Sequence, residues 1–126
     1  MKMLLLASAG GAIGAGVRYG ISQWFAARGW GELPWATLLI NISGSALMGL
    51  TAGVLMARTE LPAELRVFLA TGILGGYTTF SAFSLEVWQL AERGQISSAG
   101  AYILASVLLS VAGLGLGLLA ARTFVP

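Results

Sequence analysis

Four stretches of the chain are long, apolar and nearly free of charge, and only short polar segments separate them. They cover approximately residues 3–25, 35–56, 67–90 and 96–121. A helix of about 20 apolar residues crosses the hydrocarbon core of a bilayer, so each stretch has the length of a membrane span. A mean hydropathy of +0.85 with 10% charged residues leaves too little polar surface for a soluble domain. We therefore predict an all-α protein with one domain over residues 1–126 and four transmembrane helices, multi-pass in the cell (inner) membrane.

The basic residues outside these spans are spread almost evenly over the two sides of the membrane. One side, with both termini, carries Lys2, Arg58, Arg66 and Arg122, and the other carries Arg28 and Arg93. Basic residues favour the cytoplasmic side, so the pattern gives only a modest preference for cytoplasmic termini. It is equally compatible with insertion in both orientations, which would permit an antiparallel dimer.

The composition excludes several classes of function. Histidine, cysteine and aspartate are absent, which rules out disulfides, thiolate chemistry, histidine-ligated metals and a Ser-His-Asp nucleophile. No set of nucleophile, base and orienting group can be assembled, so we do not expect an enzyme. A net charge of +2 is too thinly spread to follow the phosphates of a nucleic acid.

Pairs of glycines four residues apart recur in three of the spans. Such stripes of small residues let helix backbones approach closely, so we interpret them as packing seams, with a glycine-lined pore as the alternative. The pairs are Gly10 and Gly14, Gly16 and Gly20, Gly49 and Gly53, and Gly113 and Gly117.

The third span contains the strongest departure from a plain lipid-facing helix. Its run over residues 72–84, GILGGYTTFSAFS, places two adjacent glycines before two β-branched threonines, which makes a poor continuous helix. A break inside the membrane frees backbone carbonyls, which are tolerated only when they are buried in protein or coordinate something. We therefore expect a broken third helix with an ion as its natural partner.

Two stripes of polar side chains lie on neighbouring spans. Asn41 lies between Thr37 and Ser45 on one face of the second span, and Tyr102, Ser106 and Ser110 repeat every four residues in the fourth. One stripe alone would be explained by hydrogen bonds between helices. Two stripes in one small bundle favour a polar pathway.

Two charged residues lie within the spans. Arg18 can extend to the interface, form a structural ion pair or attract anions near a pore mouth. Glu86, toward the loop end of the third span, can pair with a base, lie in an aqueous vestibule or carry protons in a transporter.

Two phenylalanines follow the expected break. Phe80 and Phe83 lie three residues apart on one helical face, flanked by Ser81 and Ser84. Phenylalanine in a membrane helix is usually apolar bulk, but its ring edge carries the positive side of the quadrupole. Two edges at a dry constriction can hold an anion without binding it too tightly.

In these combinations the chain resembles the CrcB/Fluc family of fluoride ion channels over essentially its whole length. The matching motifs are Gly14-x-x-x-Arg18, Asn41-Ile-Ser-Gly44, the run from Gly75 to Glu86, and Tyr102-x-x-x-Ser106-x-x-x-Ser110. Of these motifs, the run in the third span distinguishes this family best from other families. One departure is Ala82, where the family frequently has a hydroxyl residue.

The resemblance implies an antiparallel, dual-topology homodimer with two separate pathways that passively export fluoride and protect against its toxicity. Phe80 and Phe83 would then contact the ion with their ring edges, and the Asn41 amide would donate to it. Ser106 and Ser110, with Tyr102 and Thr37, would form a polar track opposite the rings. The remaining pathway residues implied in this way are Thr79, Ser81, Ser84 and Glu86, with Arg18 as a structural or vestibule charge.

The resemblance also implies a structural sodium ion at the dimer centre. The backbone carbonyls of Gly75 and Thr78 would bind it, two from each subunit. This ion would stabilise the interface and would not be transported. We expect no organic cofactor.

Two other functions remain open on the residues. A small dual-topology, proton-coupled multidrug exporter would need a carboxylate in the membrane, for which Glu86 is the only candidate. A structural subunit would use the glycine seams to dock to a larger complex.

Overall fold

The computed structural model describes residues 1–125, and the regular structure in this range is entirely helical. Three spans are single helices: α1 (Lys2–Ala27), α2 (Trp35–Ala57) and α6 (Ile96–Phe124). The span between α2 and α6 is built from α3 (Ala63–Arg66), η1 (Val67–Leu74), α4 (Gly75–Tyr77) and α5 (Phe80–Glu92). All four are long and apolar enough to cross a membrane, which confirms the expected set of four helices with an interrupted third.

The interruption falls on the two threonines and not on the two glycines before them. Gly75 and Gly76 are helical in α4, whereas Thr78 (φ −77°, ψ 156°) and Thr79 (φ −151°, ψ 116°) are extended. Gly76 stays helical because its backbone packs directly on Gly11 of α1, where a Cβ would not fit. Packing between helices thus overrides the low helix propensity of glycine at this point.

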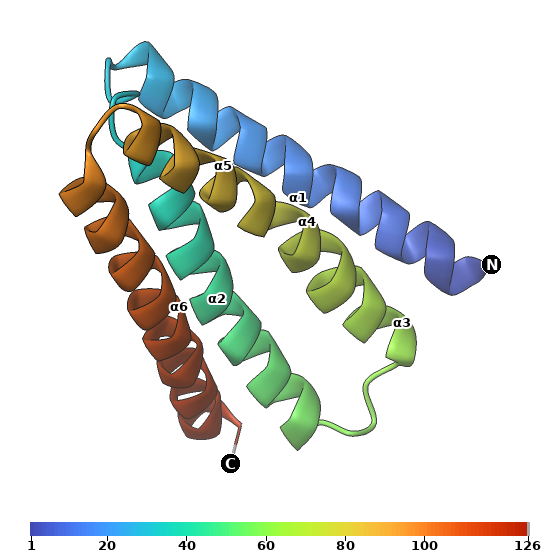
Figure 1. Cartoon of the computed structure of the whole chain (residues 1–126). Coiled ribbons are helices and arrows are strands. Elements are labelled where there is room, and N and C mark those ends of the chain that lie inside the picture. The colour runs from blue at the N-terminus through green and yellow to red at the C-terminus, as the bar shows by residue number, and fades with distance from the viewer. Residues whose placement is uncertain (126) are drawn as a thin grey trace.

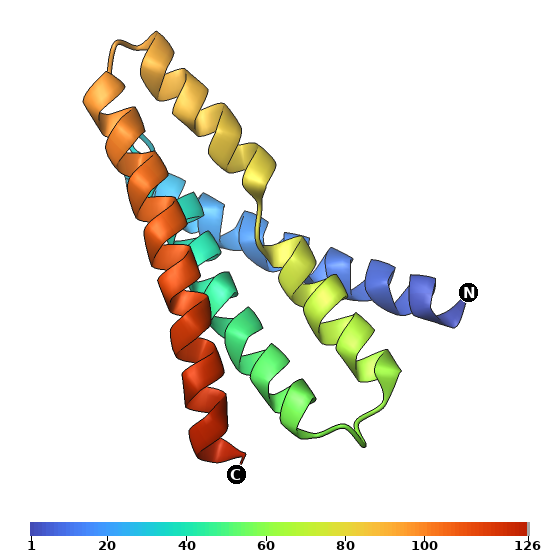
Figure 2. The same ribbon diagram turned by 60° about the horizontal axis from the view of Figure 1, so that its bottom comes forward.

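Close backbone contact joins the helices in two pairs. A Cβ at Gly49 would overlap the Leu114 carbonyl oxygen, and one at Gly117 would overlap that of Ala46, so α2 and α6 are in direct contact along their length. In the same way, Gly10 and Gly14 bring α1 onto η1 and α4. Figures 1 and 2 show the two pairs diverging from each other, with η1 and α4 between α1 and α2, and Figure 2 shows α5 leaving this position toward the start of α6.

The seam interpretation is therefore correct for three of the four glycine pairs, because Gly53 and Gly113 also contact the opposite helix. It is wrong within this chain for Gly16 and Gly20. A Cβ at either position would meet nothing within 4 Å.

The small apolar core lies at the end of the molecule where α5 meets α6. Phe83, Leu90, Ala99 and Tyr102 are buried together there, and Leu33, Leu38 and Val87 pack against them. The tight turn from α5 into α6 passes through Gly94, whose φ of +77° is accessible to glycine at little cost. This core holds α5 against α6 just beyond the break.

We predict that Gly117→Ala destabilises the protein by about 1–3 kcal/mol, because the added methyl group is forced into the Ala46 backbone. Thermal unfolding of purified protein in detergent would measure the loss. Gly115→Ala is the matched control, since it lies in the same helix and its Cβ would meet nothing within 4 Å. Equal melting temperatures for the two variants would contradict close packing of α2 on α6.

Candidate functional site

A cavity of about 350 Å³ lies between α2, the break, α5 and α6. Six of the pathway residues expected from the sequence line it: Asn41, Thr79, Phe80, Phe83, Ser106 and Ser110. The rest of its wall is formed by Gly44, Ser45, Met48, Thr78, Val107, Val111 and Leu114. The apolar members of this second group carry no signal that distinguishes them in sequence from lipid-facing residues. Segments 38 residues apart thus meet at one cavity.

Asn41 is bound to the backbone of the break by both ends of its amide. Its Nδ2 donates to the Thr79 carbonyl oxygen at 3.0 Å, and its Oδ1 accepts from the Thr79 N–H at 2.8 Å. The Thr79 side chain in turn accepts from the Ala82 N–H at 3.2 Å and caps α5. Three hydrogen bonds therefore replace the ladder that is lost at the break.

Two hydroxyl groups on the opposite wall have no partner. Ser106 Oγ and Ser110 Oγ are buried, yet within residues 1–125 neither makes a hydrogen bond. A buried hydroxyl without a partner costs free energy, so these groups are available for something that enters the cavity.

Three aromatic rings form a row from the break toward the loop end. The ring centroids of Phe80 and Phe83 are 5.4 Å apart, and those of Phe83 and Tyr102 are 5.1 Å apart. Phe83 is buried, whereas Phe80 is 77% exposed at the open side of the cavity. The exposed ring needs a further apolar surface, from lipid or protein.

Thr37, Tyr102 and Glu86 form a separate cluster beyond Phe83. The Thr37 hydroxyl donates to Glu86 Oε1 and the Tyr102 hydroxyl donates to Oε2, each at 2.7 Å. Both hydroxyl hydrogens are thus directed at the carboxylate, and only oxygen lone pairs remain for other contacts. None of the three residues lines the cavity between α2, α5 and α6.

Glu86 also lines a second, smaller cavity at the loop end, of about 180 Å³. The polar groups around this cavity include Glu32, Gln89 and Arg93. The carboxylate therefore lies between the buried cluster and a polar opening, and in the described chain it forms no ion pair.

Ser81 and Ser84 do not reach the cavity in a single chain. Both are exposed on α5. The Ser84 hydroxyl donates to the Phe80 carbonyl oxygen at 2.9 Å, and Ser81 Oγ is 3.4 Å from Thr79 Oγ1.

Arg18 lies outside the cavity and contacts the third span on the other side of the break. Its Nε donates to the Gly76 carbonyl oxygen at 3.2 Å. Nearby, Ser43 Oγ and the Tyr77 hydroxyl are 2.9 Å apart. Of the roles open to Arg18, an ion pair is absent among residues 1–125, and its contact is to the backbone.

The carbonyls of Gly75 and Thr78 lose their usual helical partners. In a continuous helix, the Thr79 N–H would donate to Gly75 and the Ala82 N–H to Thr78. Here these two groups donate to Asn41 Oδ1 and Thr79 Oγ1 instead. Within residues 1–125 there is no cluster of acidic side chains that could hold a metal.

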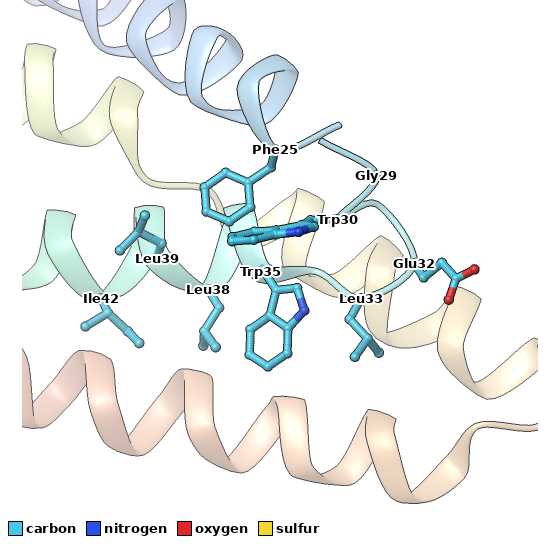
Figure 3. Close-up of a pocket in the computed structure, with 9 residues that line it drawn as sticks. All are labelled: Phe25, Gly29, Trp30, Glu32, Leu33, Trp35, Leu38, Leu39 and Ile42. Atoms are coloured by element: carbon cyan, nitrogen blue, oxygen red, sulfur yellow. The ribbon is translucent and has the colours of Figure 1, made fainter. Parts of the chain in front are cut away.

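A larger cavity, of about 660 Å³, lies elsewhere, between the end of α1 and the start of α2. Figure 3 shows the rings of Phe25, Trp30 and Trp35 and the side chains of Leu38 and Leu39 along it. Its walls are almost entirely apolar, and the Glu32 carboxylate points away from them. The polar side-chain groups among its described lining residues are the indole N–H groups of Trp30 and Trp35 and the Glu32 carboxylate.

Comparison with known proteins places this geometry in context. The family model described as "CrcB-like protein, Camphor Resistance (CrcB)" matches residues 5–118. A protein of Rhodospirillum centenum named fluoride-specific ion channel FluC is 51% identical over 99% of each chain. Proteins with the same name from Rhizobium meliloti (47% identical, over 99% of this chain and 100% of the relative) and Nitrobacter hamburgensis (FluC 1; 49%, over 91% of each chain) are also similar. These names describe channels and not enzymes.

We predict that Thr79→Val lowers the free energy of unfolding by about 1 kcal/mol, because α5 loses its side-chain cap. Thermal unfolding in detergent would measure the change. Thr123→Val is the control, because that hydroxyl only donates to a carbonyl of its own helix and is exposed. A cap that contributes nothing would leave Thr79→Val as stable as the control.

Proposed function

The chain belongs to the CrcB/FluC family, and we propose that it is a passive, fluoride-selective channel whose ion passes through the cavity between α2, α5 and α6. The observation that carries this proposal is the pair of buried, unpartnered hydroxyls of Ser106 and Ser110 opposite the phenylalanine rings. Fluoride is small and strongly hydrated, so a pathway must replace its water with several donors.

The lining of the cavity offers these donors at moderate strength. Each serine hydroxyl has one hydrogen to give, the Asn41 amide has a second Nδ2 hydrogen, and the ring edges of Phe80 and Phe83 are weakly positive. None of the described lining residues is basic. Without a fixed cation, the ion is solvated and yet released quickly.

Thr37, Tyr102 and Glu86 form the loop-side end of this pathway in our proposal. An ion that reaches them must compete with the carboxylate for the two hydroxyl hydrogens. The smaller polar cavity beside Glu86 then serves as the vestibule.

The driving force is the electrochemical gradient. The sequence contains no phosphate-binding loop for ATP. Fluoride enters a cell as the neutral acid and dissociates in the cytoplasm. A passive channel then lets the anion leave under the negative membrane potential, which protects against toxicity.

We further propose that two chains assemble as an antiparallel, dual-topology homodimer with one pathway in each half. The exposed ring of Phe80 and the exposed side chains of Ser81 and Ser84 support this assembly, since a second subunit would cover them. The Gly16 and Gly20 stripe, unused within one chain, offers a further close-packing surface.

A structural sodium ion at the centre of this dimer fits the break. The carbonyl oxygens of Gly75 and Thr78 have lost their helical donors, and oxygen is the ligand that a hard cation prefers. When bound, the ion would supply a positive charge that holds four backbone dipoles together. It takes no part in transport.

We predict that Phe80→Ile and Phe83→Ile each lower the rate of fluoride efflux from proteoliposomes at least about tenfold, because aliphatic groups lack a positive edge. A tenfold lower rate corresponds to an activation barrier that is higher by about 1.4 kcal/mol. Vesicles are loaded with potassium fluoride or potassium chloride. Adding valinomycin lets potassium leave and so starts anion efflux, and ion-selective electrodes measure the released fluoride or chloride. Phe124→Ile, at the exposed end of α6, is the control.

Normal fluoride efflux in both ring variants would rule out the ring-edge role. Absence of fluoride efflux from folded wild-type protein would overturn the channel itself. Proton-coupled efflux of a cationic drug that disappears in Glu86→Gln would then identify the exporter instead.

We also predict that sodium raises the melting temperature of the purified protein above its value in choline at equal ionic strength. A ligand that binds only the folded state adds stability according to its concentration and affinity. Identical melting temperatures over a sodium titration would exclude a structural sodium site at the break.

A further inference from the structure

We infer that Asn41 is a positioning residue: its amide fixes the start of α5, and with it Phe83, before any ion arrives. This inference rests on the proposed function, in which Asn41 also donates to fluoride. It adds a second role, carried out through the backbone of Thr79.

The pair of hydrogen bonds defines the orientation of the amide. Oδ1 accepts from the Thr79 N–H at 2.8 Å while Nδ2 donates to the Thr79 carbonyl oxygen at 3.0 Å. Turning the amide over would oppose two acceptors and two donors, so only one orientation is compatible with both bonds. One Nδ2 hydrogen is therefore bonded to Thr79. Because the amide group is planar, this pair of hydrogen bonds also sets the direction of the second Nδ2 hydrogen.

Apart from the packing of Leu38 against the core that includes Phe83 and Leu90, few interactions connect α2 to α5 in the described residues. Downstream of the break, the hydrogen bonds from α2 side chains to the third span are those of Asn41 to Thr79 and of Thr37 to Glu86. Upstream, Ser43 bonds the Tyr77 hydroxyl, on the other side of the extended residues. Asn41 is thus the contact at the point where the chain leaves the extended segment and begins α5.

The position of Phe83 depends on that starting point. Phe83 is one helical turn beyond Thr79, and its ring is packed at 5.1 Å from that of Tyr102 on α6. If the Thr79 backbone is released, α5 can move against α6, and the distance and tilt between these two rings change. The magnetic environment of the Phe83 ring therefore reports on the Asn41 amide without any fluoride present.

The experiment places 4-fluorophenylalanine at position 83 and records the ¹⁹F spectrum of the purified full-length protein in fluoride-free buffer. Asn41→Ala and Asn41→Leu remove both bonds, and Ser43→Ala removes one bond between α2 and the third span upstream of the break. The leucine variant is included because leucine suits a membrane helix if alanine impairs folding, which size-exclusion chromatography checks. Fluoride efflux is measured on the same unlabelled variants.

We expect both Asn41 variants to shift or broaden the position-83 resonance and to lower fluoride efflux at least about tenfold. Ser43→Ala should leave the resonance in place. If a folded Asn41 variant gives the same position-83 resonance as the wild-type protein, the inference is overturned. If that variant has also lost fluoride efflux, Asn41 acts only by contacting the ion. If wild-type protein conducts no fluoride but the Asn41 variants still shift the resonance, the positioning role stands and the proposed function fails.

Discussion

A bilayer core supplies no water to an exposed backbone, and this constraint governs the centre of the molecule. A chain that interrupts its helix there must find a partner for each freed N–H and C=O group. The Thr78 N–H still donates to the Leu74 carbonyl oxygen. At Thr79 the partners are side chains: the amide of Asn41 bonds both the N–H and the C=O of Thr79, and the hydroxyl of Thr79 accepts from the N–H of Ala82. The carbonyls of Gly75 and Thr78 lose their usual helical donors in this rearrangement. The break is thus compatible with the membrane because a second helix presents an amide at the correct height.

The glycine seams make that arrangement possible. Packing in lipid gains little from the hydrophobic effect, so helices associate through close contact of their backbones. Gly49 and Gly117 hold α6 against α2, which brings Ser106 and Ser110 opposite the residues of the break. On the other side, Gly10 and Gly14 hold α1 against η1 and α4, where Arg18 reaches Gly76. Each seam therefore fixes one wall of the region around the break.

Much of this organisation could be predicted from periodicity and composition. Apolar length predicts the four helices, and polar residues four apart predict that Asn41 and the serines share a region. The partners of individual groups could not be predicted in this way. That Asn41 bonds the backbone, or that the Thr37 and Tyr102 hydroxyls both donate to Glu86, depends on the relative height of helices distant in sequence. The position of the break at Thr78, beyond the glycines, likewise depends on the contact between Gly76 and Gly11.

The segment η1 adds a constraint on how the third span is wound. Over Val67–Leu74 the helix is of the π type, which is wider than an α-helix and takes more residues to complete each turn. If the same 8 residues were wound as an α-helix, each would turn the chain by about 100°, which is more than in a π-helix, and every residue after them would point in a different direction. Gly76 would turn away from Gly11, and Thr79 from Asn41. The π winding of this segment thus decides which face of the third span meets its neighbours.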